Sequence, residues 1–197
     1  MAASANDTTL ESVVLASPVL SAIHAAWPAV GLPDGWLVAG AVAQTVWNNA
    51  FGFSANHGIK DADIIYFDRS DLTETTEEHH GKRIRRLFAH LPVAVDVKNE
   101  ARVHCWYEAK FGKPIEPYQS AAHAISTFPT TATCIGVRSA PSGLEIEAPY
   151  GLSDLFALAV RPNKTLITQE VYEAKIARWR YGRTCRFFHG TEHESAS

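Results

Sequence analysis

Two aspartates at the start of an apolar segment are the residues of this chain best placed to do chemistry. Asp61 and Asp63 stand two positions apart, directly before the strand-forming residues Ile64 to Phe67. Alternate side chains of a strand point to the same face, so we expect the two carboxylates about 6–7 Å apart there. Two negative charges on one face repel each other, and Mg²⁺, which prefers oxygen ligands, would relieve that repulsion. The pair therefore predicts a metal site, although an isolated Asp-x-Asp is also typical of the solvated start of a strand.

A third acid makes the metal-site prediction more specific. Asp96 lies in the middle of the apolar segment 93–97, where an unpartnered carboxylate would be costly to bury. If this segment forms a strand beside the first one, Asp96 joins Asp61 and Asp63 in a single cluster. Three converging carboxylates can hold two metal ions, which is the arrangement used for in-line displacement at phosphorus.

A turn of small residues precedes the acids and is suited to receive a phosphate. Gly40 and Ala41 fall where a short buried strand, residues 36–39, gives way to a helical pattern. The backbone N–H groups of such a turn, together with the helix N-terminus, form an anion site. Other polar and basic residues complete the candidate nucleotide site, each of them about equally consistent with ordinary protein surface. They are Thr45, Asn48, Lys60, Lys98 and Arg102.

The order of these motifs resembles that of the DNA polymerase β-like nucleotidyltransferase superfamily. Its signature is an apolar strand, a Gly-Gly or Gly-Ser turn, a strand with two aspartates two positions apart, and a later strand with one aspartate. Three segments resemble more closely a bacterial family of small proteins called nucleotidyltransferase-like, namely residues 40–48, 58–63 and 95–104. The likeness extends from about residue 32 to residue 180.

The resemblance implies a reaction and roles for the candidate residues. It implies that the turn at Gly40 cradles the triphosphate of an NTP, and that Asp61, Asp63 and Asp96 bind Mg²⁺, or Mn²⁺ in its place. The implied reaction is attack of an acceptor hydroxyl on the α-phosphate, which transfers a nucleoside monophosphate and releases pyrophosphate. Asp96 would also help to draw off the hydroxyl proton. Ala41 departs from the family pattern, which usually has Gly or Ser there, and so lacks a hydroxyl that could contact phosphate.

The elements that must position these residues alternate between helix and strand in the first half of the chain. Apolar periodicity and capping signals predict helices at 18–27, 41–51 and 71–86 and strands at 36–39, 61–67 and 93–97. For the second half they predict a helix at 120–128, hairpin strands at 133–137 and 144–147, and helices at 153–160 and from 168. This order predicts an α+β fold, a small mixed sheet with flanking helices, which is the polymerase β-like core plus a C-terminal α/β appendage.

Length and composition limit the class of protein. With 197 residues, 46% of them hydrophobic, the chain suits one globular domain with a small addition. We expect a nucleotidyltransferase core with N-terminal helices at 1–110, an appendage packed on the core at 111–190, and a flexible tail at 191–197.

Charge, cysteines and the N-terminus indicate the surroundings of the protein. A formal net charge of −3 gives no global attraction to nucleic acid or to an anionic membrane. Cys105, Cys134 and Cys185 form no disulfide framework, and the N-terminus lacks the basic and apolar regions of a signal peptide. These features predict a cytoplasmic protein without a membrane partner. Its partners would be an NTP and an acceptor that is a small molecule, an RNA end or a protein hydroxyl.

Two other functions fit the same residues. One is a non-catalytic nucleotide-binding regulatory module of the same fold, which the departure at Ala41 allows and which would bind NTP without releasing pyrophosphate. The other is a metal-dependent phosphohydrolase or nuclease, in which the acid cluster serves a water nucleophile. Hydrolysis of phosphodiesters without NTP consumption would distinguish that second function.

Overall fold

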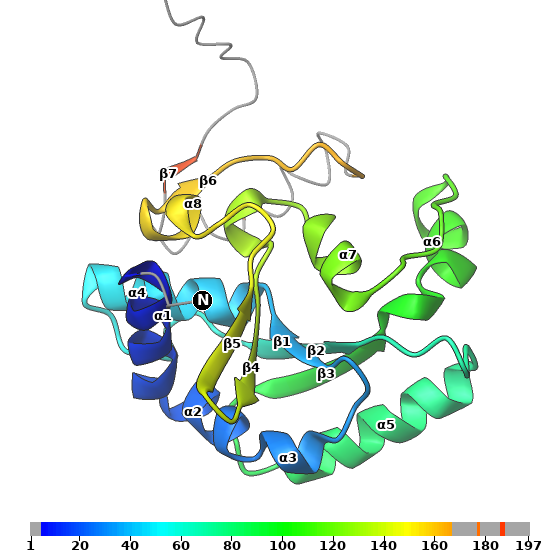
Figure 1. Cartoon of the computed structure of the whole chain (residues 1–197), viewed down its shortest axis with the longest axis horizontal. Coiled ribbons are helices and arrows are strands. Elements are labelled where there is room, and N and C mark those ends of the chain that lie inside the picture. The colour runs from blue at the N-terminus through cyan, green and yellow to red at the C-terminus, as the bar shows by residue number, and fades with distance from the viewer. Residues whose placement is uncertain (1–4, 167–176, 178–185, 188–197) are drawn as a thin grey trace, which may run out of the picture.

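A five-stranded mixed sheet forms the centre of the computed structural model, which describes residues 5–166, 177 and 186–187 (Figure 1). The strands of this sheet are β1 (Trp36–Val38), β2 (Asp61–Tyr66), β3 (Ala94–Asn99), β4 (Gly136–Ala140) and β5 (Gly143–Glu147). The α-helices are α1 (Ala5–Ala16), α2 (Pro18–Ala25), α3 (Trp27–Val30), α4 (Gly40–Phe51), α5 (Glu74–Leu87), α6 (His104–Phe111), α7 (Ala121–Ser126) and α8 (Ser153–Phe156). The remaining described elements are the 3₁₀ turns η1 (Glu100–Arg102) and η2 (Thr131–Thr133) and the parallel pair β6 (Ala159–Val160) and β7 (Arg186–Phe187).

The strand order of the sheet is β3-β2-β1-β4-β5. β2 and β3 run parallel and α5 connects them, whereas β1 pairs antiparallel with both β2 and β4, and β4 with β5. A parallel pair needs a crossover of this kind, because a tight turn cannot return the chain to the same end of the sheet. β2 and β3, which hold the three aspartates of the predicted metal site, are therefore neighbours in space.

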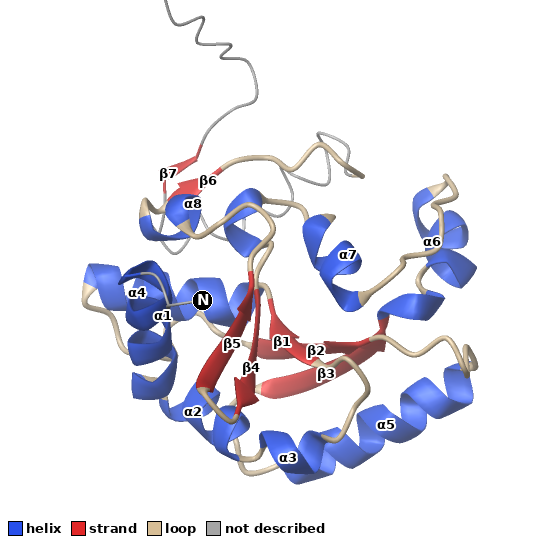
Figure 2. Cartoon of the chain, in the orientation of Figure 1, coloured by secondary structure: helices blue, strands red, loops and turns tan. Residues whose placement is uncertain are grey.

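Helices cover the two faces of the sheet unequally (Figure 2). On one face, alternate strand residues such as Ile64, Val95 and Val97 join a large core with side chains of α1, α2, α4 and α5. On the other face, Val38 and Ile65 pack in a smaller cluster with residues of α7. The strict alternation along β3, where Val95, Val97 and Asn99 are buried, leaves Asp96 and Lys98 on the α7 side.

Most of the predicted elements are confirmed, and the helix boundaries show which local signals were decisive. Ser17 caps α2 as expected, since its hydroxyl accepts a hydrogen bond from Leu20 N at 3.4 Å. The predicted start of α5 at Asp71 is wrong, because Thr73 is the cap. Asp71 instead accepts hydrogen bonds from the backbone and side chain of the residues around that cap, Thr73 and Thr76, and these hold its pKa at about 2.

The predicted helix at 153–160 is also wrong in its length. α8 ends at Phe156, and residues 159–160 form the short strand β6. α1 lies in the region for which N-terminal helices were expected without bounds, and no predicted helix corresponds to α3 or α6. The predicted last helix from Thr168 and the predicted tail at 191–197 lie outside the described residues.

Both parts of the predicted domain division contribute to one sheet. β4 and β5 lie beyond residue 110 and continue the sheet from β1 through the register pairs Leu37–Val137 and Val38–Gly136. The boundary at residue 110 stays a prediction about function, since the sheet runs across it.

Among the described residues, no single helix is long and apolar enough to cross a membrane. α1 and α2 reach that length and composition only as a pair, and the chain bends by 97° between them. Apolar residues of both helices, among them Leu10, Leu20 and Ile23, pack in the core.

Candidate functional site

A cleft of about 170 Å³ opens on the α7 side of the sheet. Its floor is formed by β1, β2 and β3, and part of its wall comes from Phe128 and Pro129, which follow α7. Among the residues that line it are two of the three predicted metal ligands, Asp63 of β2 and Asp96 of β3, together with Lys98 of β3. The cleft is therefore where the structure brings the sequence-predicted acids together.

Strand register places Asp63 and Asp96 side by side. The two residues are direct partners in the parallel ladder between β2 and β3, and Val38 of β1 is the partner of Asp63 on its other side. Register partners point to the same face of a sheet, so both carboxyl groups face the cleft. The register thus brings Asp96 next to Asp63, which is one of the two acids of β2.

Asp61 lies apart from this arrangement. It is the exposed first residue of β2, it pairs with Ala94, and it does not line the cleft. Within the described residues no group of three His, Cys, Asp or Glu side chains is placed to hold a metal ion. Asp63 and Asp96 alone still suit magnesium, which is often held by one or two carboxylates with water and substrate phosphates as the other ligands.

The turn between β1 and α4 forms one rim of the cleft. Ala39, which lines the cleft, has a φ of 56° and a ψ of −118°, a conformation that a residue with a Cβ rarely adopts. Gly40 begins α4, and a Cβ at this position would meet no atom within 4 Å. The first N–H groups of a helix have no intrahelical partner, so this turn offers donors beside Asp63.

Three of the residues expected to contact nucleotide are buried and make their contacts inside the fold. Ala41 is buried in the large core, and its carbonyl accepts a hydrogen bond from the buried Thr45 hydroxyl at 2.8 Å. Asn48 is fully buried and donates to the carbonyls of Ala55 and His57 at 3.0 and 2.9 Å, which ties the loop after α4 to the helix. These positions hold the turn and its helix in place and do not face the cleft.

The three predicted basic residues occupy different environments. Lys98 is half-exposed, lines the cleft and lies 3.8 Å from Glu77 of α5. Arg102 is mostly buried and pairs with Glu77 at 2.8 Å, so its charge is used within the protein. Lys60 is exposed beside Asp61. Lys98 is accordingly the predicted cation that the structure places at the cleft.

Glu100 is a cleft residue that the sequence reasoning missed. It lies in η1 directly after β3, is only 8% exposed, and lines the same cleft as Asp63 and Asp96. Burial, together with the nearby carboxylates of Glu77 and Asp63, raises its pKa to about 8. In the sequence, Glu100 lies two positions beyond Lys98, where a longer strand would have placed it on the same face. The strand ends at Asn99, however, and a 3₁₀ turn follows.

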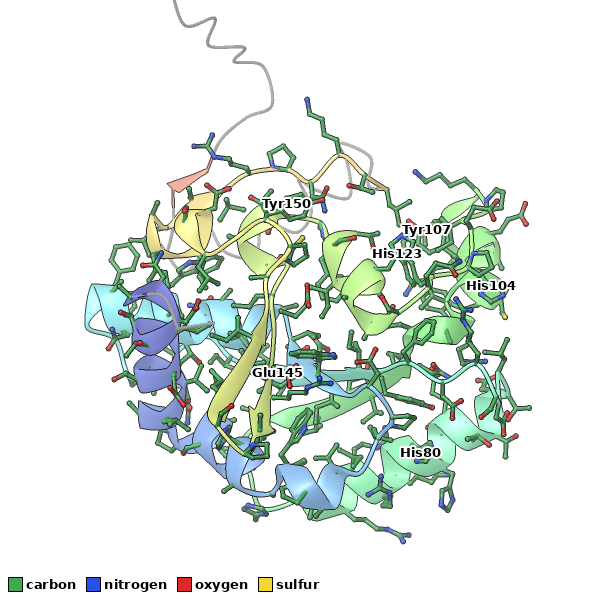
Figure 3. The ribbon with its side chains drawn as sticks, viewed as in Figure 1. His80, His104, Tyr107, His123, Glu145 and Tyr150 are labelled. Atoms are coloured by element: carbon green, nitrogen blue, oxygen red, sulfur yellow. The ribbon has the colours of Figure 1, made fainter. Side chains whose placement is uncertain are left out.

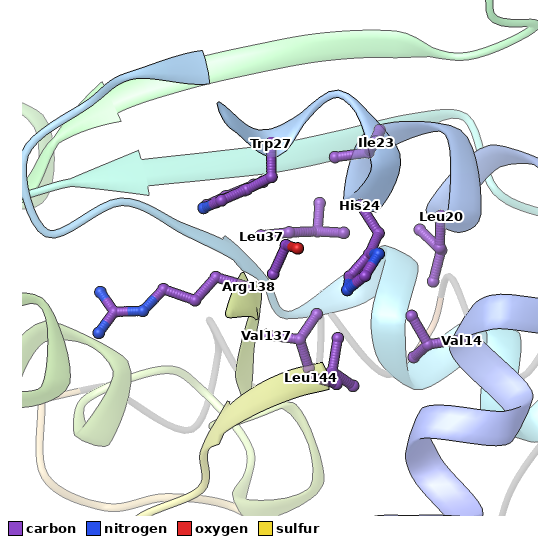
Figure 4. Close-up of a pocket in the computed structure, with 10 residues that line it drawn as sticks. Val14, Leu20, Ile23, His24, Trp27, Leu37, Val137, Arg138 and Leu144 are labelled. Carbon is purple, nitrogen blue, oxygen red and sulfur yellow. The ribbon is translucent and has the colours of Figure 1, made fainter. Parts of the chain in front are cut away.

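A second cavity lies on the opposite face of the sheet (Figure 4). It measures about 10 Å³, and its lining is mainly apolar, with Leu20 and Leu37 among its residues. The ring of His24 reaches it with a buried Nε2 that has no hydrogen-bond partner among the described residues. A space of this size holds about one water molecule, and no carboxylate lines it, so it is unsuited to phosphate chemistry.

Three histidines near the cleft side or on α5 lie on separate elements. Figure 3 shows His80 on α5, His104 on α6 and His123 on α7. His80 packs edge-on against Tyr66 with ring centroids 5.4 Å apart, and burial lowers its pKa. None of these three residues lines the cleft.

Comparison with known proteins decides the family. A model of a family described as nucleotidyltransferase matches residues 25–185, which is most of the chain. The chain belongs to this nucleotidyltransferase family. A search of curated proteins finds no match. One similar solved structure has a TM-score of 0.76 and 25% sequence identity, over 92% of this chain and 95% of the other. It is an NMR structure described as revealing a CCA-adding enzyme head domain.

Family and fold together confirm the expected class of enzyme. The nucleotidyltransferase match includes β1, the turn at Gly40 and both aspartate-bearing strands. The fold prediction, a mixed α+β sheet with flanking helices like that of a nucleotidyltransferase head domain, is confirmed as well. The roles of individual residues of this nucleotidyltransferase remain predictions.

Proposed function

We propose that this nucleotidyltransferase transfers a nucleoside monophosphate from an NTP to a hydroxyl acceptor in a metal-dependent reaction at the α7 side of the sheet. The observation that carries the proposal is the register pair Asp63–Asp96, which faces a cleft bordered by the turn at Gly40. Mg²⁺, or Mn²⁺, would be held by these two carboxylates, and when bound it would offset the negative charge of the phosphates. Asp61 would join from the start of β2.

The donor nucleotide would bind with its phosphates toward the turn between β1 and α4. The N–H groups at the start of α4, which have no intrahelical partner, and the dipole of that 12-residue helix favour negative charge there. Gly40 leaves the space above the turn open, because it has no Cβ. Lys98, on the other side of the acid pair, would contribute a positive charge to the same phosphates.

The acceptor would bind on the β3 side of the cleft. Its hydroxyl oxygen attacks the α-phosphorus, the bond from this phosphorus to the oxygen that bridges to the β-phosphate breaks, and pyrophosphate leaves. Asp96 would accept a hydrogen bond from the hydroxyl and receive its proton. Phe128 and Pro129 of the second half of the chain form a wall of the cleft, which supports the proposal that residues beyond 110 serve the acceptor.

The similarity to a solved structure bears on the class of acceptor. The similar solved structure is described as a CCA-adding enzyme head domain, and this description favours a hydroxyl at the end of a nucleic acid chain. The formal net charge of −3 offers no general attraction to such a chain. A small molecule and a protein hydroxyl are therefore the other outcomes of the test below.

A screen of labelled NTPs against a cell extract, with Mg²⁺ or Mn²⁺, tests this function. We expect label to pass to one class of acceptor with release of pyrophosphate, and we expect Asp63→Asn and Asp96→Asn to lower the rate at least 100-fold, since each removes a charged ligand. Glu116→Gln, which changes an exposed acid outside the cleft, is the matched control and should retain the parent rate.

Three results would contradict the proposal. Transfer that survives both aspartate substitutions would show that the acid pair is not the reaction centre. NTP binding without pyrophosphate release, with every acceptor fraction, would indicate a regulatory module. Cleavage of phosphodiesters without NTP consumption would indicate a hydrolase or nuclease. Asp61→Asn, assayed separately, measures whether the exposed acid of β2 contributes.

A further inference from the structure

Glu100 is a mostly buried acid whose carboxyl group has no hydrogen-bond partner among the described residues. It is 8% exposed, and its oxygens make no hydrogen bond or ion pair with any described residue. Burial of this kind is costly for an acid, because the carboxyl group loses part of its contact with water and gains no hydrogen bond from the described residues. A buried polar group that the fold does not satisfy is a candidate for a role in binding.

The neighbouring buried acid shows the contrast. Glu77 of α5 is 7% exposed, and both of its oxygens are used, one by Arg102 at 2.8 Å and the other by the backbone N–H of Asn99 at 2.8 Å. Glu77 therefore binds α5 to the end of β3. Glu100, one residue after Asn99, makes no comparable contact and is directed to the cleft that Asp63 and Asp96 also line.

The position of Glu100 separates it from the donor phosphates. The turn at Gly40 follows β1, whereas Glu100 follows β3, with β2 between the two strands. A carboxyl group would repel a triphosphate and would suit an uncharged hydrogen-bonding group better. Apolar residues of the cleft, among them Ile65 and Phe128, are consistent with an uncharged part of a ligand there.

We propose that Glu100 is an acceptor-binding residue, which hydrogen-bonds a hydroxyl group of the acceptor at the β3 side of the cleft. A hydroxyl both donates and accepts, so it pairs with a carboxyl group in either protonation state, whereas an ammonium group needs the ionised form. The raised pKa of Glu100, to about 8, agrees with a mostly buried carboxyl group that is suited to a neutral partner. This inference rests on the proposed function, since it names a contact to the acceptor of that reaction.

Three variants test it: Glu100→Ala, Glu100→Gln and, as matched control, Glu108→Ala, which changes an exposed acid of α6. Each is assayed for label transfer from the NTP that the parent uses, over a range of extract concentrations. Binding of a non-hydrolysable analogue of that NTP with Mg²⁺ is measured by calorimetry, and thermal unfolding is measured without ligand. The second and third measurements report on donor binding and folding separately from transfer.

We expect Glu100→Ala to lower transfer at limiting extract at least tenfold, mainly by raising the extract concentration needed for half-maximal rate. Affinity for the NTP analogue should stay within twofold of the parent, and both Glu100 variants should unfold at or above the parent temperature. Glu100→Gln, which can still hydrogen-bond a hydroxyl, should fall between the parent and Glu100→Ala, at least threefold below the parent. Glu108→Ala should match the parent.

Several outcomes would overturn the inference. Parent-level transfer by Glu100→Ala, or by Glu100→Gln if the alanine variant does not fold, would remove the acceptor contact. Loss of NTP affinity in parallel with transfer would place Glu100 on the donor, and lower unfolding temperatures in both variants would give it a structural role. A parent protein that transfers no label from any NTP would end this inference together with the proposed function, whereas the other outcomes leave the proposed function intact.

Discussion

At the scale of single residues, the turn between β1 and α4 contains a strained residue, Ala39, followed by Gly40, which has open space where a Cβ would lie. Ala39 adopts a φ of 56° and a ψ of −118°, which is costly for any residue with a Cβ. Its N–H is held by the carbonyl of Ile135 at 2.9 Å, and its carbonyl accepts the N–H of Ala43 at 3.0 Å. Backbone strain of this kind tends to occur at functional sites, and Ala39 lines the cleft.

Gly40→Ala tests whether donor phosphates approach this turn. The added Cβ would meet no protein atom within 4 Å, so we expect the free energy of unfolding to stay equal to that of the parent or to rise by about 0.5–1 kcal/mol, as for Gly replaced by Ala in a helix. NTP affinity should fall about tenfold, because the methyl group occupies space above the turn. Urea unfolding and calorimetric titration of the NTP measure the two effects.

Ala39→Gly is the companion variant of the same turn. It removes a Cβ from a strained conformation, and we expect it to raise the free energy of unfolding by about 1 kcal/mol while NTP affinity is retained. Equal loss of affinity in both variants would show that the geometry of the turn, rather than the space above Gly40, is what the nucleotide requires. Unchanged affinity in Gly40→Ala would place the phosphates elsewhere.

The sequence predicted some residues of the cleft and missed others for a definite physical reason. Asp63 and Asp96 could be paired in advance because strand alternation fixes the face of a side chain once the strands are known. Thr45 and Asn48 lie on a helix whose sides are determined by packing against distant segments, and both proved to be buried. Glu100 follows the strand in a 3₁₀ turn, where neither the strand period nor the α-helix period predicts which way a side chain points.

At the scale of elements, Glu77 connects α5 to the strand that bears Asp96. Its carboxyl group pairs with Arg102 and accepts the N–H of Asn99, so one side chain joins the crossover helix, the end of β3 and η1. The side chain of Asn99 adds bonds to the backbone of Asp68 and Asp71 in the loop before α5. β3 is an edge strand of the sheet, with β2 as its neighbour, and these bonds attach its end to α5 and to the loop after β2.

Glu77→Ala should therefore destabilise the protein strongly. It would leave the mostly buried Arg102 without its partner, and loss of one member of a buried ion pair costs about 3–5 kcal/mol. Glu78→Ala is the matched control, since Glu78 pairs with Lys82 and Arg85 at half-exposed positions, where such pairs contribute about 0–1 kcal/mol. Urea unfolding of both variants measures the difference, and equal losses would contradict a special role of Glu77.

The helix boundaries show how far local signals extend. Ser17 followed by Pro18 is a strong start signal, and α2 begins there. Asp71 and Thr73 are both acceptable caps, and the choice of Thr73 became visible only with the backbone around it. The segment at 153–160 divides because residues 159–160 pair with residues 186–187, a contact between distant parts of the chain that no local pattern indicates.

At the scale of the whole molecule, the mild net charge of −3 conceals an uneven distribution. Asp63 and Asp96 line one cleft with Lys98 as the basic residue among its lining. Negative charge concentrated in this way destabilises the folded protein in the absence of cations. Binding of a divalent cation to the folded state alone would raise the apparent stability by mass action.

The stability of the whole chain should consequently depend on pH through Glu100. Its pKa is about 8 in the folded protein against an ordinary value of 4.5, because of burial and of the carboxylates of Glu77 on α5 and Asp63 on β2, with Lys98 on β3 acting in the opposite direction. Below about pH 4.5 both the folded and the unfolded chain hold this proton. Between about pH 4.5 and 8 only the folded chain holds it, so the free energy of unfolding falls as pH rises, by up to about 1.4 kcal/mol per pH unit.

Other groups also titrate over this range, so the prediction concerns the difference between the parent and Glu100→Gln. The variant cannot ionise at this position, and its advantage in the free energy of unfolding should grow from about pH 5 to pH 8 and then level off, because above the folded-state pKa both states of the parent are ionised. Urea unfolding of the two proteins at matched ionic strength, without divalent cations, measures the difference at each pH. A difference that stays constant across this range would mean that Glu100 ionises at its ordinary pH in the folded protein, and therefore that the wall of the cleft around it is open to water.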